Sequence, residues 1–381
     1  MKLNMMTDKG NAPGGMGAVC LDGTDAGFYF SKATDDSKKT SWQLYFQGGG
    51  WCYDAEDCHQ RSKTTLGSSK SWAKTSSMGG IMSGDCTVNP DYCNFNRVHM
   101  AYCDGNSFAG DATDPISVNG EQIYFRGRRI IDAVIQTLTE KYDFGSATEV
   151  LLTGCSAGGL ATYLHTDYVQ TLMPSSVTKY AASAISGFFL LHPTVAKLPV
   201  YPEQMENIFN ISNATGGVNA DCIAAQAPAD KWKCNFAEFS YAYTKAPTFP
   251  LNSALDSWQT VCIYTAEPVP DFPAQTGIEN GDCVNTHGWN ACAKDPENCN
   301  STEMSAMNTY IDDFETKMNS TTTFSKAGNG AFIHSCHTHC EAQSGSWNSF
   351  KINGVSCAPP PPPLRLNCGL IMNPPADPLR P

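Results

Sequence analysis

The spacing of apolar residues predicts two helices and several short strands. Between residues 127 and 141, apolar side chains recur at helical intervals and form a single face. An apolar run at 149–153 predicts a strand, and a second amphipathic helix follows it. Further short strands are expected at 43–47, 97–103 and 248–252. This alternation of strands and helices is typical of an α/β protein whose mostly parallel central sheet is flanked by helices.

Hydrophobic periodicity weakens between about 193 and 247 and again between about 265 and 330. Polar residues prevail there, and cysteines gather in both stretches (Cys222, Cys234, Cys283, Cys292 and Cys299). We expect insertions over the sheet that are stapled by disulfides, because these segments bury little apolar surface of their own. Each bridge contributes about 2–4 kcal/mol, mainly by restricting the unfolded chain.

Composition narrows the range of partners. The chain has 37 acidic and 25 basic residues, and its net charge of −12 repels phosphate backbones, so we expect no nucleic-acid partner. No stretch approaches the ~20 apolar residues that a bilayer crossing needs. The best candidate, 181–191, is too short and contains serines and a glycine, so we expect a buried element there and no membrane span.

The cysteine content indicates an oxidising compartment. The chain has 17 cysteines spread from Cys20 to Cys368, a density that reducing compartments do not usually sustain. Residues 1–15 lack the basic and apolar regions of a signal peptide, so a secretory signal is expected to lie outside this sequence. We expect a secreted protein, and four N-x-S/T sequons fit that expectation as possible glycosylation sites (Asn210, Asn213, Asn300 and Asn319).

The segment Gly154-Cys155-Ser156-Ala157-Gly158 is a G-x-S-x-G motif between a predicted strand and a predicted helix. In that context the serine lies on a tight turn that projects its hydroxyl above the sheet, at the positive end of the helix. Ser156 is therefore the candidate nucleophile. The alternative is an ordinary glycine-rich turn, because the motif by itself is common.

A serine nucleophile needs a neighbouring base. Three histidines, His334, His337 and His339, lie well over a hundred residues after Ser156, in the chain order that α/β-hydrolases require. Their spacing leaves the choice among the three open. The same segment contains Cys336 and Cys340 and could instead bind zinc. In an oxidising lumen these cysteines more often form disulfides, and no second ligand cluster is evident, so we expect no metal and no cofactor.

The acid should follow a strand between the serine and the histidines. Asp256 satisfies this condition, and its carboxylate would orient the imidazole. Position alone leaves three competitors open (Asp221, Asp230 and Asp271).

Acyl transfer also needs hydrogen-bond donors for the oxyanion. The run Gly48-Gly49-Gly50-Trp51 after an early strand could supply them from Gly49, Gly50 and Trp51, together with the amide of Ala157. The alternative is a surface loop.

Several stretches, taken together, resemble the plant-type pectin acetylesterases, a family that also includes the Notum carboxylesterases. They are Gly48–Tyr53, Tyr102–Asp111, Phe125–Gly127, Gly154–Gly159, Asn252–Gln259 and Ser335–Cys340. The resemblance implies an α/β-hydrolase fold and hydrolysis of an ester on an extracellular glycan. It places the nucleophile on Ser156, the acid on Asp256 and the base on His339 rather than His334 or His337.

The resemblance covers about residues 17 to 357, which we take as one esterase domain between an N-terminal extension (1–16) and a proline-rich tail (358–381). The sequence departs from the family pattern at Gln47, Leu255 and His337, and the first two bear on substrate preference. Asp104 and Asp111 in the second stretch are expected to be architectural. Cys155 is expected to be a buried free thiol, because the elbow position belongs to Ser156 and 17 cysteines leave one unpaired.

The resulting hypothesis is a secreted, monomeric serine esterase that removes O-acetyl groups from an extracellular polysaccharide such as pectin. Two alternatives remain: a Notum-like carboxylesterase acting on a longer acyl chain, and a glycan-binding relative that has lost catalysis.

Overall fold

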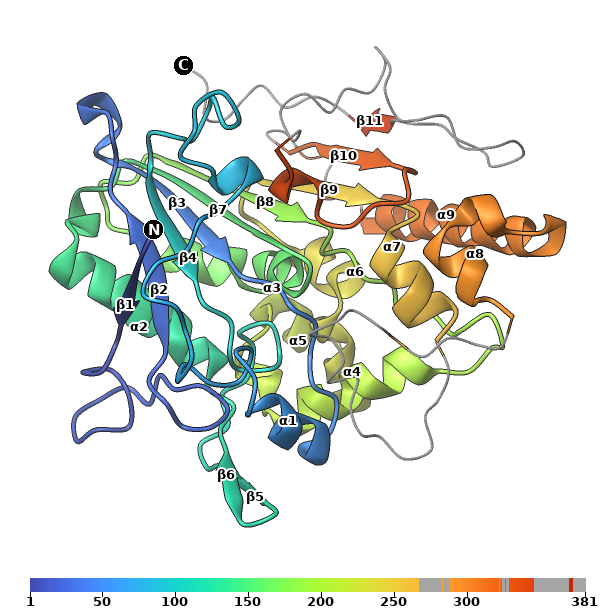
Figure 1. Ribbon diagram of the computed structural model, residues 1–381, viewed down its shortest axis with the longest axis horizontal. Helices are drawn as coiled ribbons and strands as arrows, with labels where there is room; N and C mark the ends of the chain where they lie inside the picture. The colour runs from blue at the N-terminus through green and yellow to red at the C-terminus, as the bar shows by residue number, and fades with distance from the viewer. Residues whose placement is uncertain are drawn as a thin grey trace.

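A computed structural model of the protein describes residues 1–266, 283, 288–321, 323, 326, 329–345 and 370–372 (Figure 1). Within them, a nine-stranded sheet has the order β1-β2-β4-β3-β7-β8-β9-β10-β11. Its strands are β1 (Lys2–Met5), β2 (Gly27–Ser31), β3 (Ser41–Phe46), β4 (Asn96–Met100), β7 (Glu149–Cys155), β8 (Lys179–Ile185), β9 (Thr248–Ser253), β10 (Ala331–His334) and β11 (Leu370–Met372). A separate hairpin joins β5 (Ile116–Val118) to β6 (Glu121–Ile123).

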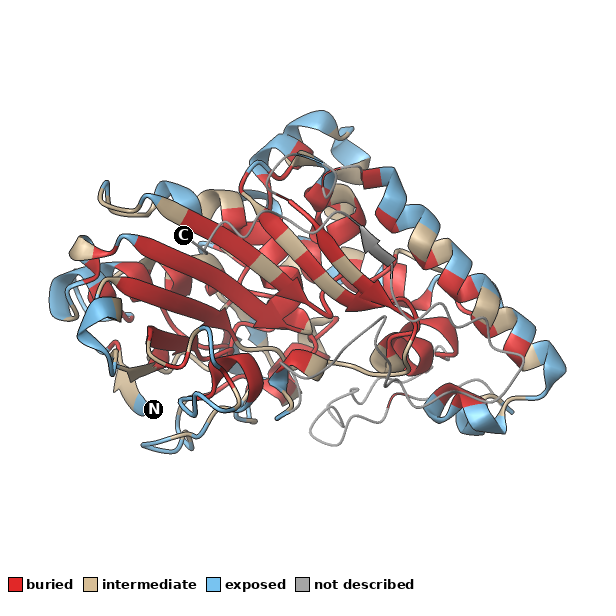
Figure 2. Ribbon diagram, turned by 90° about the horizontal axis from the view of Figure 1, so that it is seen from above, coloured by how far each residue is buried: buried red, intermediate tan, exposed pale blue. Residues whose placement is uncertain are grey.

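The central strands are parallel and the outer strands are antiparallel. The pairs from β4 through β3, β7, β8 and β9 to β10 are all parallel, whereas β1, β2 and β11 run antiparallel to their neighbours. Every residue of β3 and β7 is buried, which is typical of a parallel sheet covered on both faces (Figure 2). The mostly parallel sheet expected from the sequence is confirmed.

Alternate residues of β7 face two different cores. Val150 and Leu152 belong to the main hydrophobic cluster, which also takes in the apolar faces of α2 (Gly127–Lys141) and α3 (Ala157–Thr171). Leu151 and Cys155 belong to a smaller cluster on the other face. There the short 3₁₀ segments Gly80–Met82 (η2) and Glu341–Gln343 (η11) pack against the sheet.

The remaining described helices are short, with two exceptions. They are α1 (Ala55–Arg61), α4 (Val200–Ile211), α5 (Ala220–Ala225), α6 (Ala237–Ser240), α7 (Ser257–Gln259), α8 (Asn290–Lys294) and α9 (Ser301–Thr321). The long ones are α4 and α9, and both α8 and α9 lie at the end of the molecule beyond β9 and β10 (Figure 1). Among the described residues, no helix combines the length and hydropathy that a bilayer crossing requires.

The two stretches of weak periodicity are stapled as expected but contain more helix than expected. Disulfides Cys222–Cys234 and Cys292–Cys299 lie within them. Helix α9 was not expected from the sequence. Its buried residues recur every three or four positions (Met304, Met307, Ile311, Phe314 and Met318), and the polar residues between them hid this stripe.

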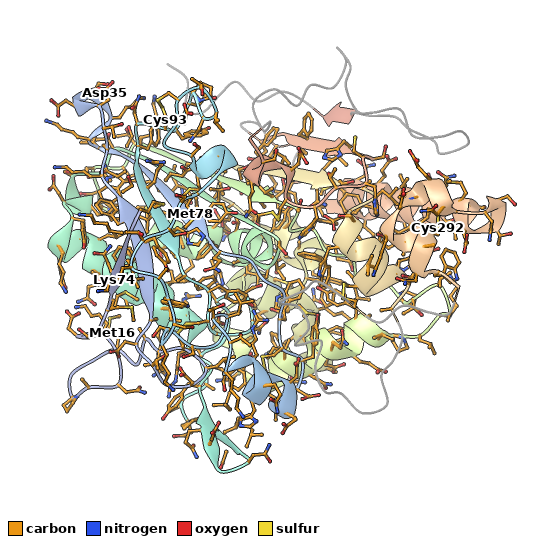
Figure 3. All side chains as sticks on the ribbon, in the orientation of Figure 1. Met16, Asp35, Lys74, Met78, Cys93 and Cys292 are labelled. Atoms are coloured by element: carbon orange, nitrogen blue, oxygen red, sulfur yellow. A yellow bond between two sulfur atoms is a disulfide. The ribbon has the colours of Figure 1, made fainter. Side chains whose placement is uncertain are left out.

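Seven disulfides join described cysteines, and Figure 3 shows Cys93 and Cys292, from two of them, at opposite sides of the molecule. Cys336 is disulfide-bonded as well. The bridges are thus spread over the whole fold rather than confined to one module.

The two ends of the chain both contribute to the sheet. Residues 2–5, within the segment predicted as an extension, form β1 and pair with β2. Most of the predicted tail (358–381) lies outside the described residues, but 370–372 form β11 and pair with β10.

A buried carboxyl in α6 predicts a pH-dependent stability. Glu238 lies 3.5 Å from Lys317 of α9, and burial raises the pKa of this carboxyl to about 7, against the opposing effect of the lysine. Between pH 4.5 and 7 the folded state holds a proton that the unfolded state has released, so stability falls as pH rises through this window.

We therefore compare the free energy of unfolding of Glu238→Gln with that of the wild type at two pH values. We expect the variant's advantage to increase by on the order of 2–3 kcal/mol from pH 5 to pH 8. Thermal unfolding of both proteins at the two pH values measures this change. An equal difference in Tm at pH 5 and pH 8 would contradict the ionisation of Glu238 as the cause.

Candidate active site

The G-x-S-x-G segment forms a tight turn between β7 and α3. Ser156 has φ 62° and ψ −130°, a conformation that residues with a side chain rarely adopt. A Cβ atom added to Gly154 would lie 2.3 Å from the carbonyl oxygen of Gly158, and one added to Gly158 would lie 2.1 Å from that of Phe46. Only glycine fits at both positions. Ser156 is partly exposed while the residues around it in the turn are buried, so its side chain is accessible.

Asp256 uses its two carboxylate oxygens for different purposes. The residue follows β9, precedes α7 and is fully buried. Its Oδ1 accepts hydrogen bonds from the backbone N–H groups of Trp258 (3.0 Å) and Gln259 (3.1 Å). Its Oδ2 lies 2.8 Å from Nδ1 of His339. Because a carboxylate only accepts, Nδ1 carries the proton and Nε2 of His339 keeps a free lone pair.

The other two histidines of the segment have different environments. Nδ1 of His334 accepts from the backbone N–H of Cys336 at 3.2 Å, and burial lowers the pKa of His334 to about 4. Nε2 of His337 lies 3.0 Å from Oγ1 of Thr260, and burial also lowers the pKa of His337. Within the described structure, His339 alone of the three pairs with Asp256. The geometry thus separates three residues that spacing could not.

The prediction of a free thiol at Cys155 is wrong, because Cys155 forms a disulfide with Cys340. The side chain of Cys155 faces the smaller core of the sheet, where the segment around Cys340 also packs. The two cysteines are 185 residues apart in sequence, and their Cα atoms are 5.7 Å apart. Counting cysteines could not reveal this pairing. The bond joins the residue before Ser156 to the residue after His339.

Hydrogen bonds hold the same two segments at the end of β8. The backbone N–H of Ser156 donates to the carbonyl oxygen of Ile185 at 3.1 Å. The backbone N–H of Cys340 donates to Oγ of Ser186 at 3.0 Å. Ile185, the last residue of β8, and Ser186, the next residue, therefore anchor the serine turn and the histidine segment respectively.

The glycine run after β3 passes beside the serine turn. A Cβ atom added to Gly48 would lie 2.9 Å from Cβ of Ser156. Nε1 of Trp51 donates to Oγ of Ser107 (2.7 Å), which in turn donates to the carbonyl oxygen of Ala157 (2.8 Å). This chain of hydrogen bonds connects the glycine run to the residue that follows Ser156, so the predicted oxyanion donors lie on two connected segments.

Three aromatic side chains, which we call the aromatic wall, pack together beside the imidazole of His339 (Trp51, Phe189 and Trp258). The ring of Trp51 lies 4.9 Å from that of Phe189 and 5.6 Å from that of Trp258. Phe189 and Trp258 in turn lie 6.3 and 6.5 Å from the His339 ring. Phe189 follows β8 without a motif and was not expected from the sequence. Trp258 could have been found, because it lies two residues after Asp256.

The other aspartates considered from the sequence are engaged elsewhere. Asp221 pairs with Lys245, and Asp230 lies 2.7 Å from Lys233. Asp271 lies outside the described residues. The two aspartates expected to be architectural have local partners, since Asp104 accepts from the N–H of Phe108 (3.0 Å) and Asp111 lies 2.7 Å from Arg129.

The departures from the family pattern also have structural partners. Oε1 of Gln47 accepts from the backbone N–H of Tyr102 at 3.1 Å and so links the ends of β3 and β4. Leu255, beside Asp256, is buried in the main core. Both residues therefore support the loops around the site.

The zinc alternative loses two of its candidate ligands. Cys336 and Cys340 are both in disulfides and supply no thiolate. In the part of the chain that the structure describes, no group of three histidine, cysteine or acidic side chains is arranged to hold a metal ion.

Replacing each histidine tests the arrangement. We expect His339→Gln to lower kcat on a small acetyl ester by at least about 10³-fold, because the imidazole paired with Asp256 is the candidate base for the serine proton. His334→Gln and His337→Gln should each keep kcat within about tenfold of the wild type. Their hydrogen bonds are to Cys336 and Thr260 rather than to Asp256. A deeper loss in either of these two than in His339→Gln would contradict the assignment.

Removing the Cys155–Cys340 bond tests its contribution to geometry. We expect the double variant Cys155→Ser/Cys340→Ser to lose about tenfold or more in kcat per folded molecule, since small displacements of reacting groups are costly. The matched control Cys222→Ser/Cys234→Ser, which breaks a bridge between residues 12 apart, should keep its kcat. Steady-state kinetics well below each Tm give the comparison, and equal kcat values in both variants would rule the effect out.

Comparisons with known proteins identify the family of this chain. A family model described as pectinacetylesterase matches residues 11–358. Pectin acetylesterase 11 of Arabidopsis thaliana is 31% identical over 338 residues, which are 88% of this chain and 80% of that protein. Palmitoleoyl-protein carboxylesterase NOTUM of Schmidtea mediterranea is 28% identical over 259 residues, covering 65% of this chain and 48% of that protein.

The fold has a counterpart among solved structures. The Wnt deacylase Notum from Drosophila aligns with a TM-score of 0.72, covering 94% of this chain and 90% of that chain, at 21% sequence identity. This likeness confirms the expected α/β-hydrolase-type fold. The family match over nearly the whole chain confirms the resemblance seen in the motifs: the chain belongs to the pectinacetylesterase family.

Proposed function

We propose that this protein is a secreted serine esterase that removes O-acetyl groups from an extracellular polysaccharide such as pectin, with Ser156, His339 and Asp256 as its catalytic residues. The observation that carries the proposal is the hydrogen bond between Asp256 and His339, in a segment that a disulfide joins to the serine turn. Membership of the pectinacetylesterase family supports the substrate class.

The reaction follows from the roles that this geometry permits. Nε2 of His339 accepts the proton of the Ser156 hydroxyl as Oγ attacks the ester carbonyl. The amide groups of the glycine run and of Ala157 donate to the oxyanion that forms. His339 then returns the proton to the leaving sugar hydroxyl, and the acetyl group stays on Ser156. Water, activated by the same imidazole, releases acetate.

Asp256 acts through the orientation of the imidazole. Its buried carboxylate keeps the proton of His339 on Nδ1 and stabilises the imidazolium that forms when Nε2 is protonated. The helix cap on its other oxygen fixes the carboxylate itself, so the pair is preorganised.

The aromatic wall favours a short acyl group. Trp51 and Phe189 are each only 1% exposed, and their rings pack edge to face beside the imidazole. Rings packed this closely would have to move apart to admit a long hydrocarbon chain beside the imidazole. The match to the Arabidopsis relative covers 88% of this chain, whereas the match to the Schmidtea relative covers 65%. This difference also favours the acetylesterase function.

Two features support secretion. Seven disulfides among the described cysteines are typical of an oxidising compartment. The four sequon asparagines are all exposed and so accessible to glycosylation (Asn210, Asn213, Asn300 and Asn319).

The central test is Ser156→Ala. We expect it to lower turnover of a small acetyl ester by roughly 10⁴- to 10⁶-fold without lowering the Tm, because the nucleophile is lost and the fold is kept. Fluorophosphonate probes should label the wild type and not the variant, which separates an active enzyme from a catalytically silent glycan-binding relative. Retention of more than a tenth of the wild-type rate would refute the assignment.

Two measurements test which substrate the enzyme prefers. One is acetate release from acetylated pectin, xylan and chitin, and the other is the relative rate on acetyl and octanoyl esters. We expect the acetyl ester to be preferred by at least about tenfold in kcat/KM, because a single extra or missing methylene in a hydrophobic pocket already changes kcat/KM by about 10- to 200-fold. A preference for octanoyl would instead support the long-chain alternative.

A further inference from the structure

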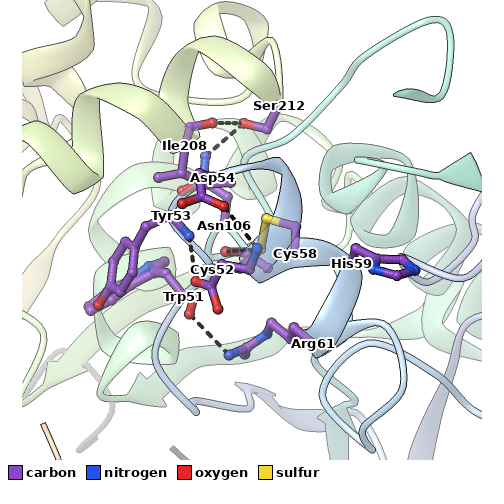
Figure 4. The surroundings of a disulfide bond; sticks show 12 residues. Trp51, Cys52, Tyr53, Asp54, Cys58, His59, Arg61, Asn106, Ile208 and Ser212 are labelled. Atoms are coloured by element: carbon purple, nitrogen blue, oxygen red, sulfur yellow. Dashed lines mark hydrogen bonds between the residues drawn. A yellow bond between two sulfur atoms is a disulfide. The ribbon is translucent and has the colours of Figure 1, made fainter. Parts of the chain in front are cut away.

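A buried arginine binds the carbonyl groups of the glycine run. Arg61, the last residue of α1, is 4% exposed. Its Nη2 donates to the carbonyl oxygen of Gly49 at 2.8 Å, and its Nη1 donates to that of Trp51 at 3.2 Å. Figure 4 shows the guanidinium directed at Trp51. A further contact of 3.5 Å joins Nη2 to the carbonyl oxygen of Gly50.

Tyr102 binds the same run from the end of β4. Its hydroxyl donates to the carbonyl oxygen of Gly50 at 2.8 Å. The guanidinium of Arg61 lies over the Tyr102 ring, 5.2 Å from its centroid. Arg61 and Tyr102 together therefore satisfy all three carbonyl groups from Gly49 to Trp51.

The carbonyl bonds determine where the amide hydrogens point. In a planar trans peptide, the C=O of one residue and the N–H of the next point in opposite directions. Holding the carbonyls of Gly49 and Gly50 toward Arg61 and Tyr102 thus directs the N–H groups of Gly50 and Trp51 away from them. Gly49 and Gly50 have φ 133° and 62°, backbone conformations that L side chains rarely adopt.

Those two N–H groups have no acceptor among the described residues. Gly50 and Trp51 are buried, yet no hydrogen bond from either backbone nitrogen occurs in this part of the chain. The next amide, that of Cys52, already donates to the carbonyl oxygen of Gly105 at 3.2 Å. Buried donors are normally paired, so two adjacent unpaired donors in the glycine run, whose first residue Gly48 approaches Ser156, indicate a place for an anionic oxygen.

An arginine suits this task better than a lysine. Its planar guanidinium presents five N–H donors in a fixed fork, whereas an ammonium is a compact charge on a flexible chain. Arg61 uses that fork on the glycine run and also donates from Nε to the carbonyl oxygen of Leu66 at 3.2 Å. A cation bound at a carbonyl also polarises its peptide group, which makes the attached N–H a stronger donor.

The arginine is itself fixed by the residues that follow the glycine run. The disulfide Cys52–Cys58 joins the end of the run to the middle of α1 (Figure 4). Asp54 caps the helix by accepting from the N–H of Asp57 at 2.8 Å. The chain thus folds back within a dozen residues, so that α1 holds the carbonyls of the loop that precedes it.

We propose that Arg61 is a positioning residue for the oxyanion hole, acting with Tyr102 through the peptide groups of Gly49 and Gly50. In this arrangement the N–H groups of Gly50 and Trp51 face the ester carbonyl oxygen bound at Ser156, a role that rests on the esterase function proposed above. Charge develops on that oxygen only in the transition state, so the effect is on kcat rather than on KM.

Arg61→Lys keeps a positive charge and removes the fork. We expect kcat on a small acetyl ester to fall by about 100-fold, the loss typical of one misplaced oxyanion donor, with KM within about threefold of the wild type. The Ki of a trifluoromethyl ketone, whose hemiketal oxyanion occupies the same position, should rise in parallel. The shape of the pH–rate profile should stay unchanged, because the imidazole is not altered.

Arg97→Lys is the matched control. Arg97 is similarly buried, at 6% exposed, and its Nη1 donates to the carbonyl oxygen of Met82 at 2.8 Å, away from the glycine run. A purely structural effect of losing a buried guanidinium would appear in both variants as a lower Tm. Only Arg61→Lys should lose kcat per folded molecule.

Tyr102→Phe gives a second, milder test that keeps Arg61 and the ring. We expect kcat to fall by about tenfold with an unchanged KM, because the carbonyl of Gly50 loses its strongest partner. This variant tests the positioning of the Gly50 peptide group if Arg61→Lys does not fold.

The outcomes separate this inference from the proposed function. An active wild type together with kcat values within threefold in Arg61→Lys and Tyr102→Phe overturns the positioning role alone. Equal losses of kcat in Arg61→Lys and Arg97→Lys overturn it as well. A wild type that hydrolyses no acetyl ester overturns the esterase proposal, and the role of Arg61 with it.

Discussion

The close approach of backbone segments at the end of β7 is the constraint on which the site depends. The turn around Ser156, the end of β3 and the start of α3 come so near one another that Gly154 and Gly158 have no space for a Cβ atom. This contact forces Ser156 into its unusual conformation, in which the side chain leaves the sheet while its neighbours are buried. The strain is maintained because the packed sheet and helix on either side allow no other path.

Two buried ionisable side chains near this turn are each held by several hydrogen bonds. Asp256 has no exposed surface, and its two oxygens bind a helix start and an imidazole. Arg61 is almost as buried and binds backbone carbonyls. A buried ion without such partners would be strongly destabilising. The same bonds that make burial tolerable also fix the orientation of the groups next to Ser156.

Covalent bonds connect parts of the site that the sheet alone would leave separate. The segment with His339 follows β10, two strands beyond β8 in the sheet order. Cys155–Cys340 ties it to the serine turn, and Cys52–Cys58 ties the glycine run to α1. Two of the seven described bridges thus border residues proposed for catalysis. Disulfides can maintain such geometry where short loops bury little apolar surface.

The sequence alone determined the elements whose signal is local. The period of α2, the apolar run of β7 and the G-x-S-x-G turn were predictable, because side-chain spacing and steric limits act over a few residues. Motif context made Ser156 the candidate nucleophile, and the family resemblance selected Asp256 and His339 from several candidates. Tertiary structure decided what depends on contacts between distant segments. Four features form only when distant segments meet. They are the disulfide between Cys155 and Cys340, the hydrogen bond between Asp256 and His339, the aromatic wall, and the hydrogen bonds from Arg61 to the glycine run. Periodicity carries no information about which distant backbone groups meet, since that is settled only when the sheet brings its carboxyl ends together.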